Sequence, residues 1–106
     1  MNRNDNIKIF ANKGENPEDF YSRFKEQLDK EHTFPGNYIF KFIIPTESKK
    51  VAQLHKIFDH SGASFSMKES KNGKYTSITI TMYVTDSISV IEYYKEASSI
   101  EGIVML

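Results

Sequence analysis

The chain has 106 residues, no cysteine, and 14 basic side chains balanced by 14 acidic ones. This length is typical of one small domain, and zero formal charge gives no net field that would draw the chain to nucleic acid or to a membrane. The absence of cysteine excludes disulfides, thiol nucleophiles and cysteine-ligated zinc.

Residues 1–16 predict a flexible polar tail, because they are rich in asparagine and carry one short apolar patch at Ile7, Ile9 and Phe10. They lack the apolar core of a signal peptide, and no later stretch approaches the roughly 18 apolar residues of a membrane span. We therefore expect a cytoplasmic protein without a membrane segment.

Residues 17–32 predict an N-terminal helix that ends near Glu31. Asn16 can cap this helix and Pro17 suits its first position, while the acidic residues that follow favour the positive end of the helix dipole. One narrow apolar stripe runs along it and consists of Phe20, Phe24 and Leu28, with Tyr21 beside them. We expect this stripe to form a single contact surface.

Residues 33–106 predict four strands and two helices in the order β-α-β-β-α-β. The strand at 37–44 is apolar on nearly both faces and is therefore central. The next helix, capped by Thr46 or Ser48, runs to about His60, and a hairpin follows at 64–84. The last helix, capped by Asp86 or Ser87, buries Ile88, Ile91 and Tyr94. The final residues, IVML, form a short strand. Right-handed crossovers place both helices on one face of a four-stranded antiparallel sheet with strand order 4-1-3-2. The predicted fold class is α+β, a ferredoxin-like βαββαβ sandwich with an extra N-terminal helix.

The hairpin is the strongest local signal. Asn72-Gly73 between two alternating runs predicts a two-residue type I′ loop, in which both central residues have φ > 0. Paired residue numbers then sum to 145, which puts the large apolar residues, Met67 among them, on one face that we expect to be core. Lys71 lies opposite Lys74 beside the turn, and we interpret this pair either as a solvated tip or as a site for a small anion or an acidic partner.

The opposite face of the sheet carries candidate residues for ligand binding and for an apolar interface. Polar candidates gather at one end of this face and at the hairpin tip: Lys41, Lys68, Ser70, Lys71, Lys74, Tyr75 and Ser77. Ile39 and Ile43 lie on the same face and need cover, and the stripe of the N-terminal helix is the nearest apolar surface. We therefore predict that Phe20, Phe24, Leu28, Ile39 and Ile43 form an interface, either within one chain or in a homodimer.

The hairpin segment KESKNGKYTSI at 68–78, together with Thr33-Phe34-Pro35 and Lys41, resembles the YbeD-like bacterial family over about residues 18–106. The long asparagine-rich N-terminus and the wording FPGNYIFKFIIP resemble members from Bacteroidetes-type bacteria. This family is a domain of unknown function with a fold similar to ACT domains, so the resemblance implies a regulatory role by analogy. ACT domains typically have a glycine in the turn after the first strand, whereas residues 45–48 have none, which argues against amino-acid binding at that position.

No catalytic or metal-binding pattern is present. His55 and His60 are five residues apart, about 140° around a helix, so they do not share a face as a metal-binding pair would. We interpret both, and His32, as surface histidines. The sequence contains no glycine-rich phosphate loop, nucleophile elbow or zinc-ligand spacing. Acylphosphatases share the fold but need an arginine in the loop after the first strand, and the arginines here are Arg3 and Arg23. We expect no enzyme activity, no cofactor and no metal.

Two functions remain compatible with this pattern. The first is a non-catalytic regulatory or interaction module that binds a small metabolite or a protein through the sheet face and the basic hairpin tip. The second is a single-stranded RNA-binding module, because RNA-recognition motifs share this topology and stack bases on sheet aromatics such as Tyr75 and Tyr83. The strands lack the basic-glycine-aromatic signature and the net charge is zero, so we favour the first function and expect no nucleic-acid partner.

Overall fold

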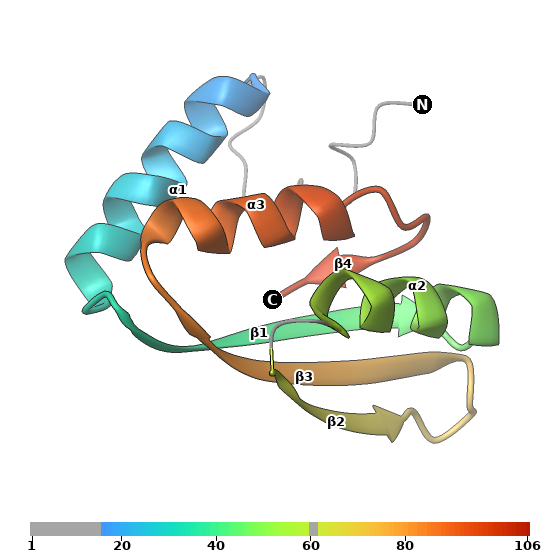
Figure 1. The fold of residues 1–106 in the computed structure, drawn as a ribbon. Coiled ribbons are helices and arrows are strands. Elements are labelled where there is room, and N and C mark those ends of the chain that lie inside the picture. Colours follow the sequence, from blue (N-terminus) through green and yellow to red (C-terminus); the bar gives the residue numbers. More distant parts are fainter. Residues whose placement is uncertain (1–15, 60–61) are drawn as a thin grey trace.

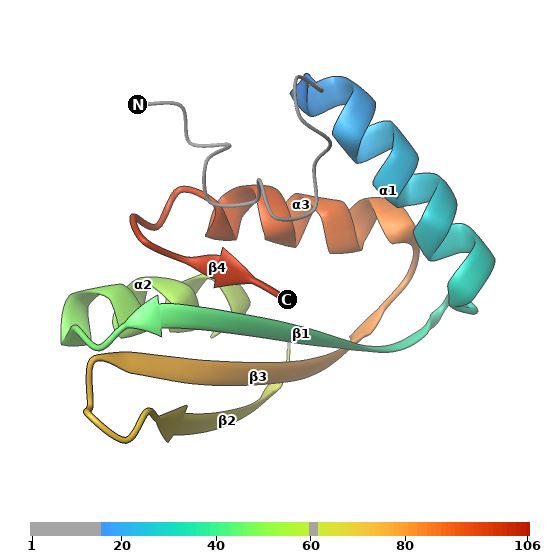
Figure 2. The same ribbon diagram turned by 180° about the vertical axis from the view of Figure 1, so that it is seen from behind.

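A computed structural model describes residues 16–59 and 62–106, so the predicted tail before Asn16 and the histidine at position 60 lie outside the described residues. The elements are α1 (Pro17–Glu31), β1 (Gly36–Pro45), α2 (Ser48–Phe58), β2 (Ser64–Glu69), β3 (Tyr75–Val84), α3 (Ser87–Ala97) and β4 (Val104–Met105). The strands form one antiparallel sheet in the order β2-β3-β1-β4. Helices α2 and α3 lie over the same face of this sheet (Figures 1 and 2). The predicted ferredoxin-like α+β fold and strand order are confirmed.

The core lies between the helices and the inner face of the sheet. Strand β1 alternates strictly, with Tyr38, Phe40, Phe42 and Ile44 buried on the inner face and their neighbours turned outward. The ring of Phe40 lies 5.1 Å from that of Phe58 on α2 and 5.2 Å from that of Tyr94 on α3. One side chain of the central strand therefore joins the sheet to both covering helices.

The β2–β3 hairpin has the predicted register but not the predicted loop. Met67 pairs with Ile78, as the sum of 145 requires. The backbone N–H of Ser70 donates to the carbonyl oxygen of Tyr75 at 2.8 Å, and this bond closes the ladder. Residues 71–74 therefore form a loop of four residues rather than two.

The loop conformation also differs from a type I′ turn. Within it only Gly73 has a positive φ, at 72°. Asn72 instead uses its side-chain oxygen, which accepts from the backbone N–H of Lys74 at 3.0 Å, and this local bond replaces the left-handed conformation expected at that position. Lys71 and Lys74 consequently belong to the loop and do not form a cross-strand pair.

Two of the three predicted helix caps are confirmed. The side chain of Asn16 accepts from the N–H of Asp19 at 2.9 Å, and that of Asp86 accepts from Ser89 at 2.8 Å. The predicted cap of α2 by Thr46 or Ser48 is wrong, because Glu47 occupies the cap position without a side-chain bond. The Thr46 hydroxyl is instead hydrogen-bonded to that of Thr76 on β3 at 2.8 Å.

Helix α1 packs against α3 and does not cover the open face of the sheet (Figure 1). Its stripe is buried within the chain: Leu28 is 3% exposed, and the ring of Phe24 lies 5.4 Å from that of Tyr94. Ile39 on the open face remains 55% exposed. The predicted packing of the stripe of α1 on Ile39 and Ile43 within one chain is therefore wrong.

The reason lies in α3. Val90, Ile91, Tyr94 and Ala97 are all buried, so the apolar surface of this helix is wide enough to face the sheet on one side and α1 on another. Ile88, predicted to be buried, is exposed, because Ser87 and Val90 take the inward positions at the start of the helix.

We expect Leu28→Ala to lower the free energy of unfolding by about 2–4 kcal/mol, because removing a buried leucine side chain leaves a cavity. Urea denaturation measures the change. Glu26→Ala, on the exposed side of the same helix, is the control and should alter stability by less than about 0.5 kcal/mol. Equal stability of the two variants would contradict the packing of α1 on its own chain.

We expect Gly73→Val to cost about 1–2 kcal/mol, because a β-branched residue resists a φ of 72°. An added Cβ would meet only the Glu69 carboxylate at 3.8 Å, so the cost comes from the backbone and not from a clash. Gly73→Asn is the matched control and should cost less, since asparagine tolerates this conformation. Thermal melting of both variants tests this, and an unchanged melting temperature for valine would refute it.

Candidate binding site

The seven predicted binding residues lie on the open sheet face and around the hairpin loop, and all are exposed. Lys41 belongs to β1, Lys68 to β2, Tyr75 and Ser77 to β3, and Ser70, Lys71 and Lys74 to the loop region. Lys41 pairs with Thr79 and Lys68 pairs with Ser77, so β3 separates the two lysines. The structure places four of the seven on the open side of the sheet, spread over three strands, and the other three in the loop between β2 and β3. Their role in binding stays a prediction.

Two of these residues have structural contacts of their own. The Ser70 hydroxyl donates to Asn72 Oδ1 at 2.9 Å and accepts from the backbone N–H of Tyr75 at 3.2 Å. The Ser77 hydroxyl donates to the carbonyl oxygen of Lys68 at 3.3 Å. Part of the segment that carries the family resemblance therefore stabilises the hairpin.

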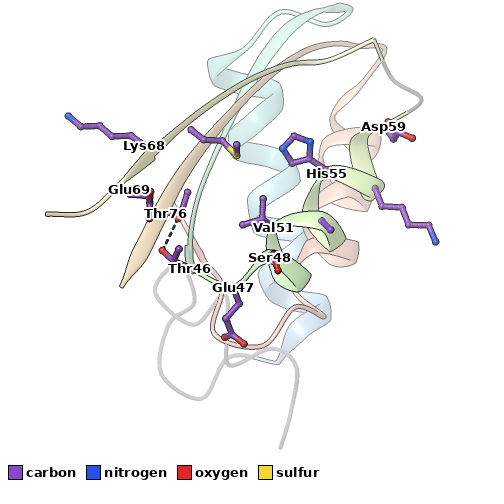
Figure 3. Close-up of a pocket in the computed structure, with 12 residues that line it drawn as sticks. Thr46, Glu47, Ser48, Val51, His55, Asp59, Lys68, Glu69 and Thr76 are labelled. Carbon is purple, nitrogen blue, oxygen red and sulfur yellow. Dashed lines mark hydrogen bonds between the residues drawn. The ribbon is translucent and has the colours of Figure 1, made fainter. Parts of the chain in front are cut away.

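A concave site lies elsewhere, between α2 and the inner face of β2 (Figure 3). This groove has a volume of about 890 Å³. Val51 and Ala52 on α2 and Met67 on β2 give it apolar walls, and Thr46 and Thr76 close one end with their mutual hydrogen bond. Of the seven predicted residues, Lys68 is the one that borders it, and its side chain points away from the groove, toward the open face of the sheet (Figure 3).

The groove exists because α2 leaves the inner face of β2 uncovered. Phe58, a buried residue of α2, contacts Phe40 and Phe42, which places the helix over the central strand. Met67, predicted to be core, is 52% exposed, and Phe65 is half-buried. The prediction failed because alternation shows which face a side chain occupies, but not whether a helix covers that part of the face.

His55 is part of the groove wall rather than a freely exposed surface residue. Its ring stacks on that of Phe65, with centroids 4.2 Å apart and planes 11° from parallel. It lies one turn beyond Val51 on α2, so both face β2. Its Nε2 atom is buried and has no hydrogen-bond partner among the described residues. The histidine thus contributes ring surface to the junction between α2 and β2.

The rim of the groove carries both signs of charge. Lys56 is basic, whereas Glu47, Asp59 and Glu69 are acidic. Glu47 is paired with Lys50 at 2.9 Å, next to the start of α2. A mixed rim with apolar walls suits a ligand that has an apolar body and charged groups of either sign.

Residues 16–59 and 62–106 hold neither a metal-binding cluster nor a helix that could span a membrane. No group of three histidine, aspartate or glutamate side chains in these ranges is arranged to hold a metal ion. None of the helices in the described part of the chain combines the length and the apolar character needed to cross a membrane.

The fold and the groove define a ferredoxin-like α+β domain with an additional helix before its first strand. Residues 29–106 match the model of the family described as "Protein of unknown function (DUF493)", and the chain belongs to this family. It is the family that the YbeD-like resemblance indicated. The assignment to Bacteroidetes-type members stays a prediction.

Two solved structures share the fold. The uncharacterized protein TM1266 from Thermotoga maritima is 12% identical, with a TM-score of 0.56 over 66% of this chain and 90% of that one. The solution structure of HP0495 from H. pylori is 20% identical, with a TM-score of 0.57 over 74% of this chain and 92% of that one. At these identities the similarity concerns the fold alone. No curated protein matches the chain.

We expect Ser70→Ala to lower stability by about 1 kcal/mol, because two hydrogen bonds of the hairpin loop are lost. Lys71→Glu in the same loop is the control and should change stability by less than about 0.5 kcal/mol. Chemical denaturation measures both. If Ser70→Ala leaves stability unchanged, the structure of the loop does not explain the presence of Ser70, and Ser70 remains a candidate binding residue.

Proposed function

We propose that this chain is a non-catalytic binding module whose ligand is a small amphipathic metabolite held between α2 and β2. The observation that carries this proposal is the groove itself. Its volume of about 890 Å³ falls in the range of roughly 300–1,000 Å³ typical of small-molecule sites. The proposal moves the ligand from the open sheet face to the groove, because the groove is concave.

The walls and the rim define the class of ligand. Val51 on α2 and Met67 on β2 both line the groove and would contact an apolar body. Lys56 at the rim, on α2, would contact a carboxylate or phosphate, and Glu69 on β2 would contact an ammonium group. A zwitterionic metabolite with an apolar side chain matches this arrangement.

A non-catalytic role is favoured by what the polar groups of the groove already do. The ring of His55 is stacked on Phe65, and its buried Nε2 atom has no hydrogen-bond partner among the described residues that would orient it as an acid or base. The hydroxyls of Thr46 and Thr76 are bonded to each other. By analogy with ACT domains we propose a regulatory role, and a chain without cysteine fits a cytoplasmic location.

Binding of single-stranded RNA is the alternative. Tyr75 and Tyr83 are 51% and 60% exposed on the open face of the sheet, as base stacking would require. They are eight residues apart on one strand, however, which is about 27 Å at about 3.4 Å per residue. Neighbouring bases cannot stack on both, so we rank this function second.

A thermal-shift screen of amino acids, their derivatives and nucleotides tests the proposal. A ligand at 100 times its Kd should stabilise the protein by about 2.7 kcal/mol. We expect the shift to disappear in Ala52→Glu, which places a long charged side chain at an exposed position of the groove wall. Ile39→Glu, on the open face, is the control and should keep the shift.

A flat screen would overturn the proposal, as would a shift that Ile39→Glu abolishes and Ala52→Glu retains. Fluorescence polarisation with mixed single-stranded RNA at about 50 mM salt covers the alternative, since such binding is strongly salt-dependent. Salt-dependent binding of RNA without any metabolite shift would exchange the ranks of the two functions.

A further inference from the structure

Strand β2 is an edge strand of the sheet. It lies at one end of the order β2-β3-β1-β4, and all six of its residues pair with β3 without a bulge. It contains no proline. Bulges, prolines, very short strands and charged side chains are the usual means by which proteins block pairing along an edge. Strand β2 has no bulge or proline, and its charged residues, Lys68 and Glu69, lie at its C-terminal end, beyond Phe65, Ser66 and Met67.

The outward backbone groups of β2 can be identified from its bonds to β3. Ser70 donates to Tyr75 at the end of the ladder, so hydrogen-bonded pairs recur at every second residue from there. Ser64, Ser66 and Lys68 therefore direct their N–H and C=O groups toward β3. Phe65 and Met67 direct theirs away from β3, where none of the described strands pairs with them.

We propose that a second copy of this chain pairs antiparallel with β2 along this edge, about a two-fold axis that passes through Ser66. In this register Phe65 of one copy lies opposite Met67 of the other, and each of these two pairs exchanges two backbone hydrogen bonds. Both copies then keep their helices on the same side of one continuous sheet.

The side chains favour a second copy in this register. On the helix side, Phe65 and Met67 bring together apolar groups that a single chain leaves partly exposed. On the other side, Ser66 faces Ser66 and Lys68 faces Ser64, so no like charges are opposed. An axis through Lys68 would oppose two lysines, and an axis through Met67 would place Glu69 against Phe65.

The pairing also completes the groove. The groove lies beside the edge, with Met67 in its wall, so Phe65 of the second copy would extend that wall beyond the strand. The grooves of the two copies would then adjoin across the axis between their α2 helices. This consequence rests on the proposed function, whereas the pairing itself does not.

A single cysteine tests the register, because the natural chain has none. Ser66→Cys should oxidise readily to a disulfide-linked dimer, since residues opposed in a non-hydrogen-bonded pair have Cα atoms about 4.5 Å apart, within the roughly 4.4–6.8 Å of disulfides. Ser64→Cys is the matched control on the same face of the same strand. Its counterpart would lie about 14 Å away at about 3.4 Å per residue, so it should remain reduced.

Light scattering of the full chain measures the association directly, and we expect twice the 12.3 kDa of one chain. Met67→Glu should give a monomer with an unchanged circular dichroism spectrum, since the residue is exposed in one copy. Ile39→Glu, equally exposed on the open face, should leave the dimer intact.

A wild-type chain that remains monomeric at about millimolar concentration would overturn the pairing. So would equal cross-linking by the two cysteine variants, or loss of the dimer in Ile39→Glu alone. A monomer that still shows the metabolite shift would overturn the pairing and leave the proposed function standing.

Discussion

The aromatic contacts at the middle of β1 determine where the covering helices lie on the sheet. Phe40 and Phe42 are fully buried, and Phe58 and Tyr94 hold α2 and α3 over them. Rings of this size remove a large apolar area from water, so the helices are centred where the rings are. Two covering helices of 11 residues each cannot then shield all four strands equally. The shortage of cover falls on the edge strand β2.

The groove and the open edge are two results of this single constraint. Because α2 is held over β1, the inner face of β2 keeps Met67 exposed and Phe65 half-buried. Since no strand of the described chain lies beyond β2, the outward backbone groups of the same residues are unpaired within one copy. Any partner that adds to the edge therefore also touches the groove, which couples assembly of the chain to the site we propose for its ligand.

The fold could be predicted from the sequence because the local patterns of apolar and turn residues agree with one another. Period-two alternation gave the inner face of β1, and the same alternation with a turn gave the register of Met67 with Ile78. The predictions that failed concern residues for which two alternative contacts or conformations compete. Asn72 had both a left-handed backbone and a side-chain bond available, and the stripe of α1 had both the open sheet face and α3. Exposure of Met67 depends on where α2 comes to lie, which no stretch of sequence near residue 67 encodes.

The hairpin loop has a structural role that follows from this geometry. Strand β2 receives little support from α2, so its position depends on the ladder to β3 and on the loop that ends it. Ser70 and Asn72 fix that loop with side-chain bonds, and Gly73 allows its one left-handed residue. These side-chain hydrogen bonds lie just after Glu69, the last residue of β2, which is two residues from Met67. The segment that most resembles the family therefore need not contact a ligand to matter for binding, because it holds straight the strand that forms one wall of the groove.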